Sequence, residues 1–86
     1  MEDYEMLLHP VMSEKAVRMI ESENKIMFLV NPKVNKTNVK YIFEKLYSVK
    51  VKKVNMLNDT NGKKRAIIKL DSKYKASELA NKLGMI

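Results

Sequence analysis

Residues 49–70 read VKVKKVNMLNDTNGKKRAIIKL, and this stretch decides the fold because it predicts two antiparallel strands joined by a tight turn. Apolar and charged residues alternate from Val49 to Lys52, which is typical of a half-buried strand. The alternation slips after this point, and a β-bulge near Lys52-Lys53 would restore the apolar face. Asn61-Gly62 predicts a type I′ turn, because both central positions of that turn need positive φ.

Two further strand predictions complete the sheet. The returning strand, residues 64–70, has an apolar face of Ala66, Ile68 and Leu70, with Arg65, Ile67 and Lys69 on the other face. Residues 25–30 (KIMFLV) are apolar almost throughout, which indicates a central strand. Asn31-Pro32 ends that strand, because proline cannot donate a hydrogen bond within a sheet.

Three helices are predicted from apolar residues at helical spacing. The first follows Ser13, a good N-cap residue, with Glu14 in the first turn, where the helix dipole favours an anion. The second is the clearest, and either Thr37 or Asn38 can cap its start. The third ends at Gly84, a typical C′ residue. The apolar stripes consist of Ala16, Val17 and Ile20 in the first helix, Val39, Ile42, Phe43, Leu46 and Tyr47 in the second, and Ala76, Leu79, Ala80 and Leu83 in the third.

The order of these elements predicts the fold class. We expect one α+β domain over residues 1–86, with helices packed on an antiparallel sheet of three to four strands. A strand–helix–strand unit followed by a hairpin favours a split βαβ-like arrangement. In that arrangement the strand around residue 68 pairs between the strands around residues 28 and 52.

Charge is distributed unevenly along the chain. Seventeen Lys and Arg against ten Asp and Glu give a net charge of +7. Residues 1–24 contain two basic and six acidic groups, whereas residues 33–69 contain eleven basic and two acidic groups, so their net charges are −4 and +9. Cations concentrated in one stretch repel one another, and an anionic polymer relieves that repulsion. The distribution favours a nucleic-acid partner over an ordinary lysine-rich surface.

The sequence offers few groups for catalysis or metal binding. Cysteine is absent, which excludes disulfides, thiolate metal sites and thiol nucleophiles. His9 is the only histidine, and its position before a proline indicates a loop residue rather than a general base. Gly62 and Gly84 are explained by a turn and a helix end, so no glycine-rich phosphate loop exists. We expect no enzymatic activity, metal, cofactor or small-molecule substrate.

The chain also lacks the sequence signals of a membrane protein. No apolar run approaches the roughly 20 residues that a membrane helix needs. The first five residues, MEDYE, are acidic, unlike a secretory signal peptide. We therefore expect a cytoplasmic protein without membrane insertion.

The basic residues lie on elements that are predicted to be neighbours. Asn35 and Lys36 lie near a helix N-terminus, where free backbone N–H groups favour phosphate. The hairpin brings basic residues of its two strands side by side, and Arg65 can bind phosphate bidentately or stack. We therefore expect the cations to form one shared RNA footprint. The expected RNA-binding residues of this stretch are Lys33, Asn35, Lys36, Lys40, Lys50, Lys52, Lys53, Lys63, Lys64, Arg65 and Lys69.

The aromatic residues indicate how RNA would be recognised. Phe28 and Phe43 fit the pattern of the core, whereas an RNA-recognition sheet that stacks bases displays aromatics on its middle strands. Here Met27, Leu29, Ile67 and Lys69 would lie on that face. We expect recognition of the backbone and shape of folded RNA, with Tyr41 as a further candidate contact.

Several segments resemble one known family. They are residues 9–16 (HPVMSEKA), 28–30 (FLV), 35–40 (NKTNVK), 49–51 (VKV) with Val54-Asn55, and 62–66 (GKKRA). In this order they are similar to the universal large-subunit ribosomal protein L-twenty-three family, in its archaeal form. Lys15 and Asn55, which lie in these segments, join the expected RNA-binding residues.

The resemblance implies a structural protein that binds large-subunit ribosomal RNA beside the polypeptide exit tunnel. It also implies contacts with neighbouring ribosomal proteins and a docking surface for the signal recognition particle and other exit-site factors. Glu14 would take part in that docking, with Arg18 and Glu21 on the same helix. An edge strand at about Tyr4 to Leu8 would precede the first helix. Bacterial relatives carry a long hairpin loop that reaches into the tunnel, whereas the loop here consists only of residues 59–62.

One alternative function remains open at this point. The charge and fold would also suit a free-standing basic nucleic-acid-binding module that is not tied to the ribosome.

Overall fold

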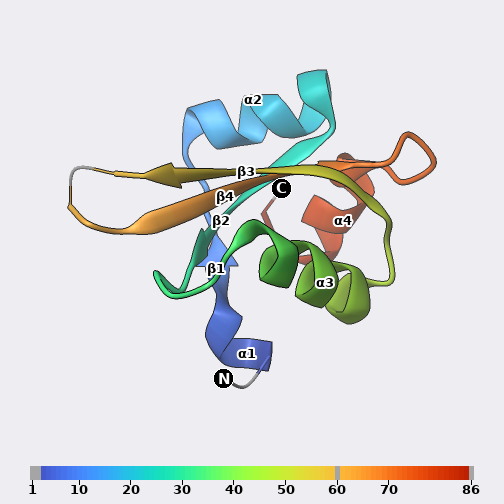
Figure 1. Ribbon diagram of the computed structural model, residues 1–86. Coiled ribbons are helices and arrows are strands. Elements are labelled where there is room, and N and C mark those ends of the chain that lie inside the picture. The colour runs from blue at the N-terminus through green and yellow to red at the C-terminus, as the bar shows by residue number, and fades with distance from the viewer. Residues whose placement is uncertain (1–2, 60, 86) are drawn as a thin grey trace.

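The computed structural model describes residues 3–59 and 61–85. The elements, in chain order, are α1 (Asp3–Met6), β1 (Leu7–Pro10), α2 (Glu14–Glu23), β2 (Lys25–Val30), α3 (Lys36–Tyr47), β3 (Val51–Asn58), β4 (Lys64–Leu70) and α4 (Ala76–Lys82). The four strands form one antiparallel sheet with the order β1-β2-β4-β3 (Figure 1). The predicted α+β fold is confirmed, including the position of β4 between β2 and β3 and the central position of β2.

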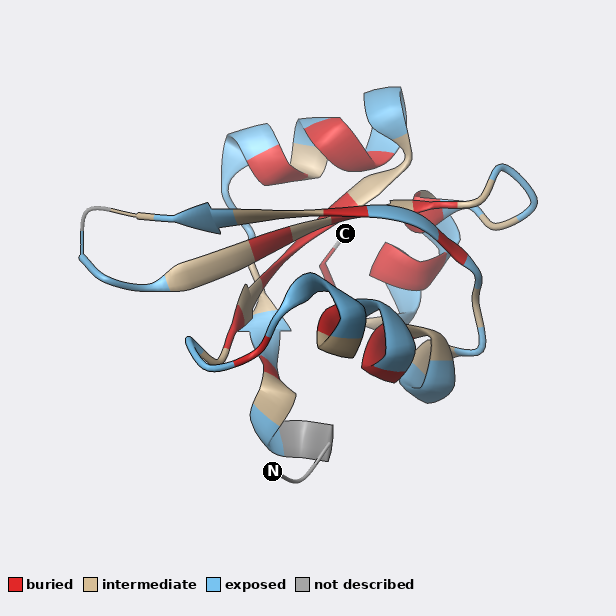
Figure 2. Cartoon of the chain, in the orientation of Figure 1, coloured by how far each residue is buried: buried red, intermediate tan, exposed pale blue. Residues whose placement is uncertain are grey.

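Helices cover both faces of the sheet. Helices α3 and α4 lie on one face and α2 on the other (Figure 1). The larger core lies on the α3 side, where Phe28 and Phe43 meet edge to face with ring centroids 5.5 Å apart. The smaller core consists of Ala16, Met19 and Met27 under α2. The buried residues of the helices lie on the sides that face the sheet (Figure 2), and no described polar or charged residue is buried.

The cross-strand register fixes which residues share a face. Ile26, Phe28 and Val30 pair with Ile68, Ala66 and Lys64, so these even-numbered positions face α3. Met27 and Ile67 pair on the opposite face and pack against the residues of α2. This alternation confirms the predicted apolar face of the returning strand, and it separates the odd-numbered polar residues of β4 from the main core.

The helix starts are set by side-chain caps. The hydroxyl of Ser13 accepts a hydrogen bond from the backbone N–H of Ala16 (3.2 Å), which confirms the predicted cap of α2. The prediction of Thr37 or Asn38 as the cap of the next helix is wrong, because α3 begins earlier. Asn35 Oδ1 accepts from the N–H of Asn38 (2.9 Å), and Asn38 Oδ1 accepts from the N–H of Asn35 (3.3 Å). This reciprocal pair forms a capping box.

The β3–β4 hairpin is confirmed, but its predicted type I′ turn is wrong. Gly62 has φ +77°, but its N–H bonds within the turn to Asp59, so Asn61 and Gly62 are not the two central residues of the turn. The oxygen Asp59 Oδ1 accepts hydrogen bonds from the N–H groups of Asn61 (2.9 Å) and Lys63 (3.0 Å). The carbonyl of Asp59 accepts from the N–H of Gly62 (3.2 Å). A longer connection organised by the Asp59 side chain therefore replaces the two-residue turn.

Strand β3 begins two residues later than the alternation suggested. Val49 and Lys50 precede the strand, which starts at Val51. The register shifts between Val51 and Lys53, which confirms the predicted bulge. Leu46, predicted as part of the apolar stripe of α3, has 45% of its surface exposed because it lies at the margin of the helix face that meets the sheet.

The edge strand expected from the family resemblance exists at a different position. It covers Leu7–Pro10 rather than about Tyr4 to Leu8, and α1 precedes it. Backbone hydrogen bonds at both ends of β1 fix how it pairs with β2. Asn31 N–H donates to the carbonyl of Met6 (3.0 Å), and Val11 N–H donates to the carbonyl of Met27 (2.8 Å). Pro10 ends β1, as expected for a residue that cannot donate to a sheet.

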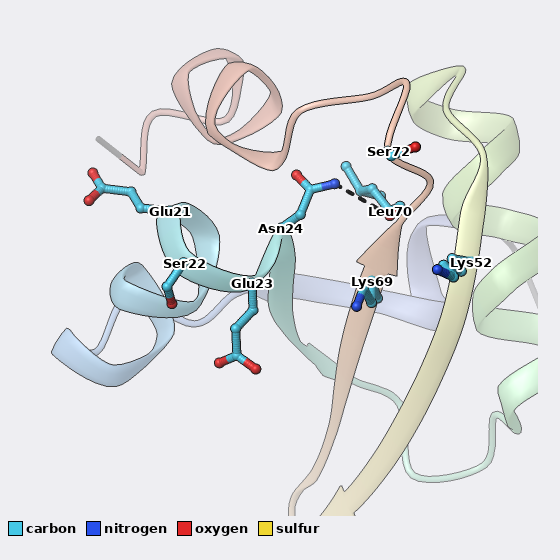
Figure 3. A pocket seen from close by; sticks show the side chains of 8 residues that line it. All are labelled: Glu21, Ser22, Glu23, Asn24, Lys52, Lys69, Leu70 and Ser72. Carbon is cyan, nitrogen blue, oxygen red and sulfur yellow. Dashed lines mark hydrogen bonds between the residues drawn. The ribbon is translucent and has the colours of Figure 1, made fainter.

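Asn24 joins the end of α2 to the connection between β4 and α4. It adopts the left-handed conformation, with φ 56° and ψ 39°. Its Nδ2 donates to the carbonyls of Leu70 (3.3 Å) and Tyr74 (2.9 Å), and its Oδ1 accepts from Ala76 N–H (2.7 Å). Figure 3 shows this side chain reaching toward Leu70. Asn24 therefore supplies the side-chain cap that Lys75, the N-cap residue of α4, does not provide.

The end of α4 agrees with the sequence. Gly84 has φ +76°, and the N–H of Met85 donates to the carbonyl of Ala80 (2.9 Å). This pairing is typical of the Schellman motif. It turns the chain so that Met85 joins the main core.

Candidate nucleic-acid interface

Three lysines form a row across the sheet on the α2 side. Lys69 of β4 is directly paired with Lys25 of β2 on one side and with Lys53 of β3 on the other. Directly paired residues of antiparallel strands have Cβ atoms about 5 Å apart on the same face, and like charges at such positions are destabilising. Glu23 offsets part of this repulsion, since its carboxylate lies 3.2 Å from Lys25 Nζ. Lys53 and Lys69 remain side by side.

Helix α2 covers only part of this face. It packs on β2 and β4 through Met27 and Ile67, and it leaves β3 uncovered. Lys53 and Leu57 are exposed, and Asn55 is half-buried between them. We call the uncovered surface the open strip, defined by Lys53, Asn55, Leu57, Arg65 and Lys69.

Arg65 lies in the open strip between two leucines. It is paired with Leu57 on β3 and with Leu29 on β2. Its Nε lies 3.6 Å from Asp59 Oδ2, and one terminal nitrogen lies 4.0 Å from the sulfur of Met27. The Nε atom is buried and has no hydrogen-bond partner among the described residues. Because Nε is buried, a ligand from outside the protein could bond only to the terminal nitrogens of Arg65.

A second set of predicted residues surrounds the loop between β2 and α3, near the hairpin. Lys64 Nζ donates to the carbonyls of Val34 (2.9 Å) and Pro32 (3.5 Å), so this lysine holds the loop in place. Lys33 and Lys36 are exposed on either side of Val34. We call this set the hairpin-end group, consisting of Lys33, Asn35, Lys36, Lys63 and Lys64.

The cations do not form the single surface that the sequence suggested. Lys36 belongs to α3, which packs on the face of the sheet opposite to Lys53 and Arg65. The sheet lies between the two groups, because adjacent side chains of a strand point to opposite faces. The other predicted residues, Lys15 on α2, Lys40 on α3, and Lys50 and Lys52 beside the bulge, are exposed.

The outer face of α2 carries the predicted docking residues. Glu14 and Arg18, one helical turn apart, form an ion pair in which a guanidinium nitrogen lies 2.7 Å from Glu14 Oε1. The exposed fractions of their side chains are 80% and 76%. Glu21 is also exposed and lines a hollow of about 470 Å³ together with Glu23, Lys52 and Lys69 (Figure 3). Acidic and basic groups therefore meet where α2 ends.

The described residues contain no cluster of three or more His, Asp or Glu side chains that could hold a metal ion. Within the same part of the chain, no helix has the length and apolar character needed to span a bilayer.

Comparison with known proteins identifies the family. The sequence profile of the family described as "Ribosomal protein L23" matches residues 5–78. The chain belongs to this family. It is also 41% identical to "Large ribosomal subunit protein uL23" from Methanococcus aeolicus over 85 residues, which cover 99% of each chain.

Membership of the L23 family defines the class of protein. The chain is a ribosomal protein, a structural component and not an enzyme, and it works in the cytoplasm as part of the ribosome. Its partners are ribosomal RNA and other ribosomal proteins. The family match favours this role over the alternative of a free-standing nucleic-acid-binding module.

Sequence reasoning missed Lys25 as a member of the lysine row. Its position at the start of an apolar strand gave no sign of its neighbours, because the pairing register of β2 and β4 cannot be read from either strand alone. Leu57 was missed for a different reason, because its exposure depends on how far α2 extends over the sheet.

Proposed function

We propose that the chain binds large-subunit ribosomal RNA near the polypeptide exit tunnel and acts over its whole length as one RNA-binding domain. The observation that supports this most strongly is the pairing of Lys53 with Lys69 beside Arg65 on an uncovered part of the sheet. Such a pair of like charges costs free energy in the isolated protein. Phosphate groups of RNA relieve that cost.

The open strip suits the backbone of a folded RNA. Lysines act as point charges on phosphate, whereas Arg65 can form two parallel hydrogen bonds. Asn55 adds an uncharged donor and acceptor between the cations. No aromatic residue lies in the strip, so phosphate and sugar contacts carry the binding there rather than stacked bases.

The salt dependence of binding tests this proposal. We expect Lys53→Gln to weaken binding to large-subunit ribosomal RNA and to reduce the slope of log affinity against log salt by about 0.7–0.9 for one lost phosphate contact. Lys82→Gln, on the last turn of α4, is the matched control and should leave the slope unchanged. Equal slopes for Lys53→Gln and the unmodified chain would contradict a role for the open strip.

A parallel variant tests the hairpin-end group. If the RNA also contacts Lys36, then Lys36→Gln reduces the slope by a similar amount, and the double variant with Lys53→Gln shows the sum. Additive losses would mean that the RNA passes from one face of the sheet to the other. An effect of only one variant would assign the footprint to one face.

We further propose that the outer face of α2 docks exit-site factors, including the signal recognition particle. Support comes from the exposure of Glu14, Arg18 and Glu21. They lie on the side of α2 opposite to the residues that pack on the sheet. We expect Glu14→Lys to reduce binding of the signal recognition particle to ribosomes while assembly of the large subunit continues. Unchanged binding would remove Glu14 from the docking surface.

A further inference from the structure

A hollow of about 380 Å³ lies beyond the N-terminus of α2, beside the open strip. Its walls are residues 9–12, Leu29, Lys63 and Arg65. The volume lies in the range of small-molecule sites in proteins, which is about 300–1,000 Å³. It is therefore large enough for one nucleotide. Neither the proposed phosphate contacts of the open strip nor the proposed docking role of α2 accounts for this hollow.

The walls of this hollow are built into the sheet. His9 is paired with Leu29, and Leu29 with Arg65, so three strands contribute adjacent side chains. The N–H of Val11 donates to the carbonyl of Met27 at 2.8 Å, which holds the segment leading to α2 against β2. Because backbone hydrogen bonds fix these positions, the hollow exists before any ligand arrives, and little ordering cost accompanies binding.

The chemistry of the lining is divided. Val11, Met12 and Leu29 supply apolar surface, and 60% of Met12 is exposed to water. Lys63 and Arg65 supply positive charge, and no acidic residue lines the hollow. Asp59 Oδ2 lies 3.6 Å from Nε of Arg65 on the hairpin side, and the Arg65 side chain lines the hollow. An apolar surface beside two cations matches a flat base attached to a phosphate.

We infer that this hollow binds a single unstacked nucleotide of the ribosomal RNA. The base lies against Met12 and Leu29, and its phosphate lies toward Lys63 and Arg65. This inference rests on the proposed RNA binding and adds a specific contact to it, since sequence-specific recognition of RNA commonly uses bases released from the stack. The charge of the lining favours a nucleotide over a segment of protein, which would have to be acidic to fit.

The experiment compares two exposed apolar residues on opposite sides of the molecule. Met12→Ser removes apolar surface from the hollow without changing charge, and Leu46→Ser makes a similar change on α3 as the matched control. We expect Met12→Ser to lower the affinity for large-subunit ribosomal RNA about fifteenfold, because it deletes about two buried methylene equivalents from the contact. The salt slope should not change, since no phosphate contact is lost. Met12→Leu should retain the affinity.

The possible results separate this inference from the proposal on which it depends. If the unmodified chain fails to bind the RNA in a salt-dependent manner, the proposed function fails. If it binds and Met12→Ser binds equally well, only the nucleotide site is refuted. An unchanged RNA affinity together with reduced binding of other proteins to large subunits would assign the hollow to a protein segment and would also refute the nucleotide site. Thermal unfolding of Met12→Ser should match that of the unmodified chain, because the side chain is exposed.

Discussion

Replacement of Asn24 by glycine isolates the contribution of one side chain to the whole fold. Glycine adopts the left-handed conformation of this position without strain, so the variant removes the side-chain hydrogen bonds alone. Three bonds are lost, to Leu70, Tyr74 and Ala76. The residue is half-buried, so water can replace part of what is lost.

The expected loss is large for a domain of this size. At about 1 kcal/mol for each hydrogen bond, the free energy of unfolding should fall by about 2–4 kcal/mol. An 86-residue chain has about 5–10 kcal/mol in total, so roughly a third of the stability depends on this residue. Asn24→Ala should cost about 1 kcal/mol more, because alanine is strained in the left-handed conformation. Asn24→Asp retains only the acceptor for Ala76 and turns a carboxylate toward two carbonyl groups.

Urea denaturation followed by circular dichroism measures these differences. The midpoint should fall while the m value stays constant, because the same surface is exposed on unfolding. Ser48→Gly provides the matched control, since Ser48 ends α3 with φ 54° and its side chain makes no hydrogen bond among the described residues. That variant should be neutral or slightly stabilising. The reasoning is refuted if Asn24→Gly shifts the midpoint no more than Ser48→Gly does.

Three further predictions concern local contacts. Lys64→Met retains the apolar stem but leaves the Val34 carbonyl without its donor, so unfolding in urea should show a loss of about 1–2 kcal/mol. Asn38→Ala removes one half of the capping box and should cost about 0.5–1 kcal/mol in the same assay. Burial raises the pKa of Tyr47 above 10.0, so its phenol should ionise at a higher pH than free tyrosine in an ultraviolet titration. Stability from this group is therefore complete below pH 10 and lost as the pH rises through the folded-state pKa. Ionisation of Tyr47 at the pH of free tyrosine would contradict this prediction.

The parts of the fold that were predicted correctly depend on local periodicity. The stripe of α3 and the alternation of β4 each carry enough residues to fix the face that meets the core. The bulge was also visible, because a slip in alternation can be seen within one strand. These features depend on neighbouring residues in the chain and need no knowledge of tertiary contacts.

Some predictions were wrong because two similar side chains could cap the same helix or bond the same turn. Others were wrong because the partner of a residue lies far away in the sequence. Asn35 and Asn38 are both good caps, and only the reciprocal bond between them places the start of α3. The type I′ turn failed because the Asp59 carboxylate provides stronger local hydrogen bonds than the Asn-Gly pair could provide alone. The sequence could not show that Lys36 and Lys53 lie on opposite faces of the sheet, because the face on which a lysine lies depends on the register of strands far apart in the sequence.

The irregular start of β3 has a consequence for the protein before it reaches its RNA. Strand β3 is an edge strand of the sheet. Its eight residues have backbone groups on the outer side that are not paired within the sheet, and such an edge can pair with a strand of another chain. The register shift between Val51 and Lys53 twists this edge strand, and the exposed charges of Lys52 and Lys53 repel a second copy of the chain. At the other edge of the sheet, β1 has only four residues and ends in proline, so it also offers little backbone for pairing. The register shift and the exposed charges of β3 thus oppose the pairing of this edge with a second copy of the chain.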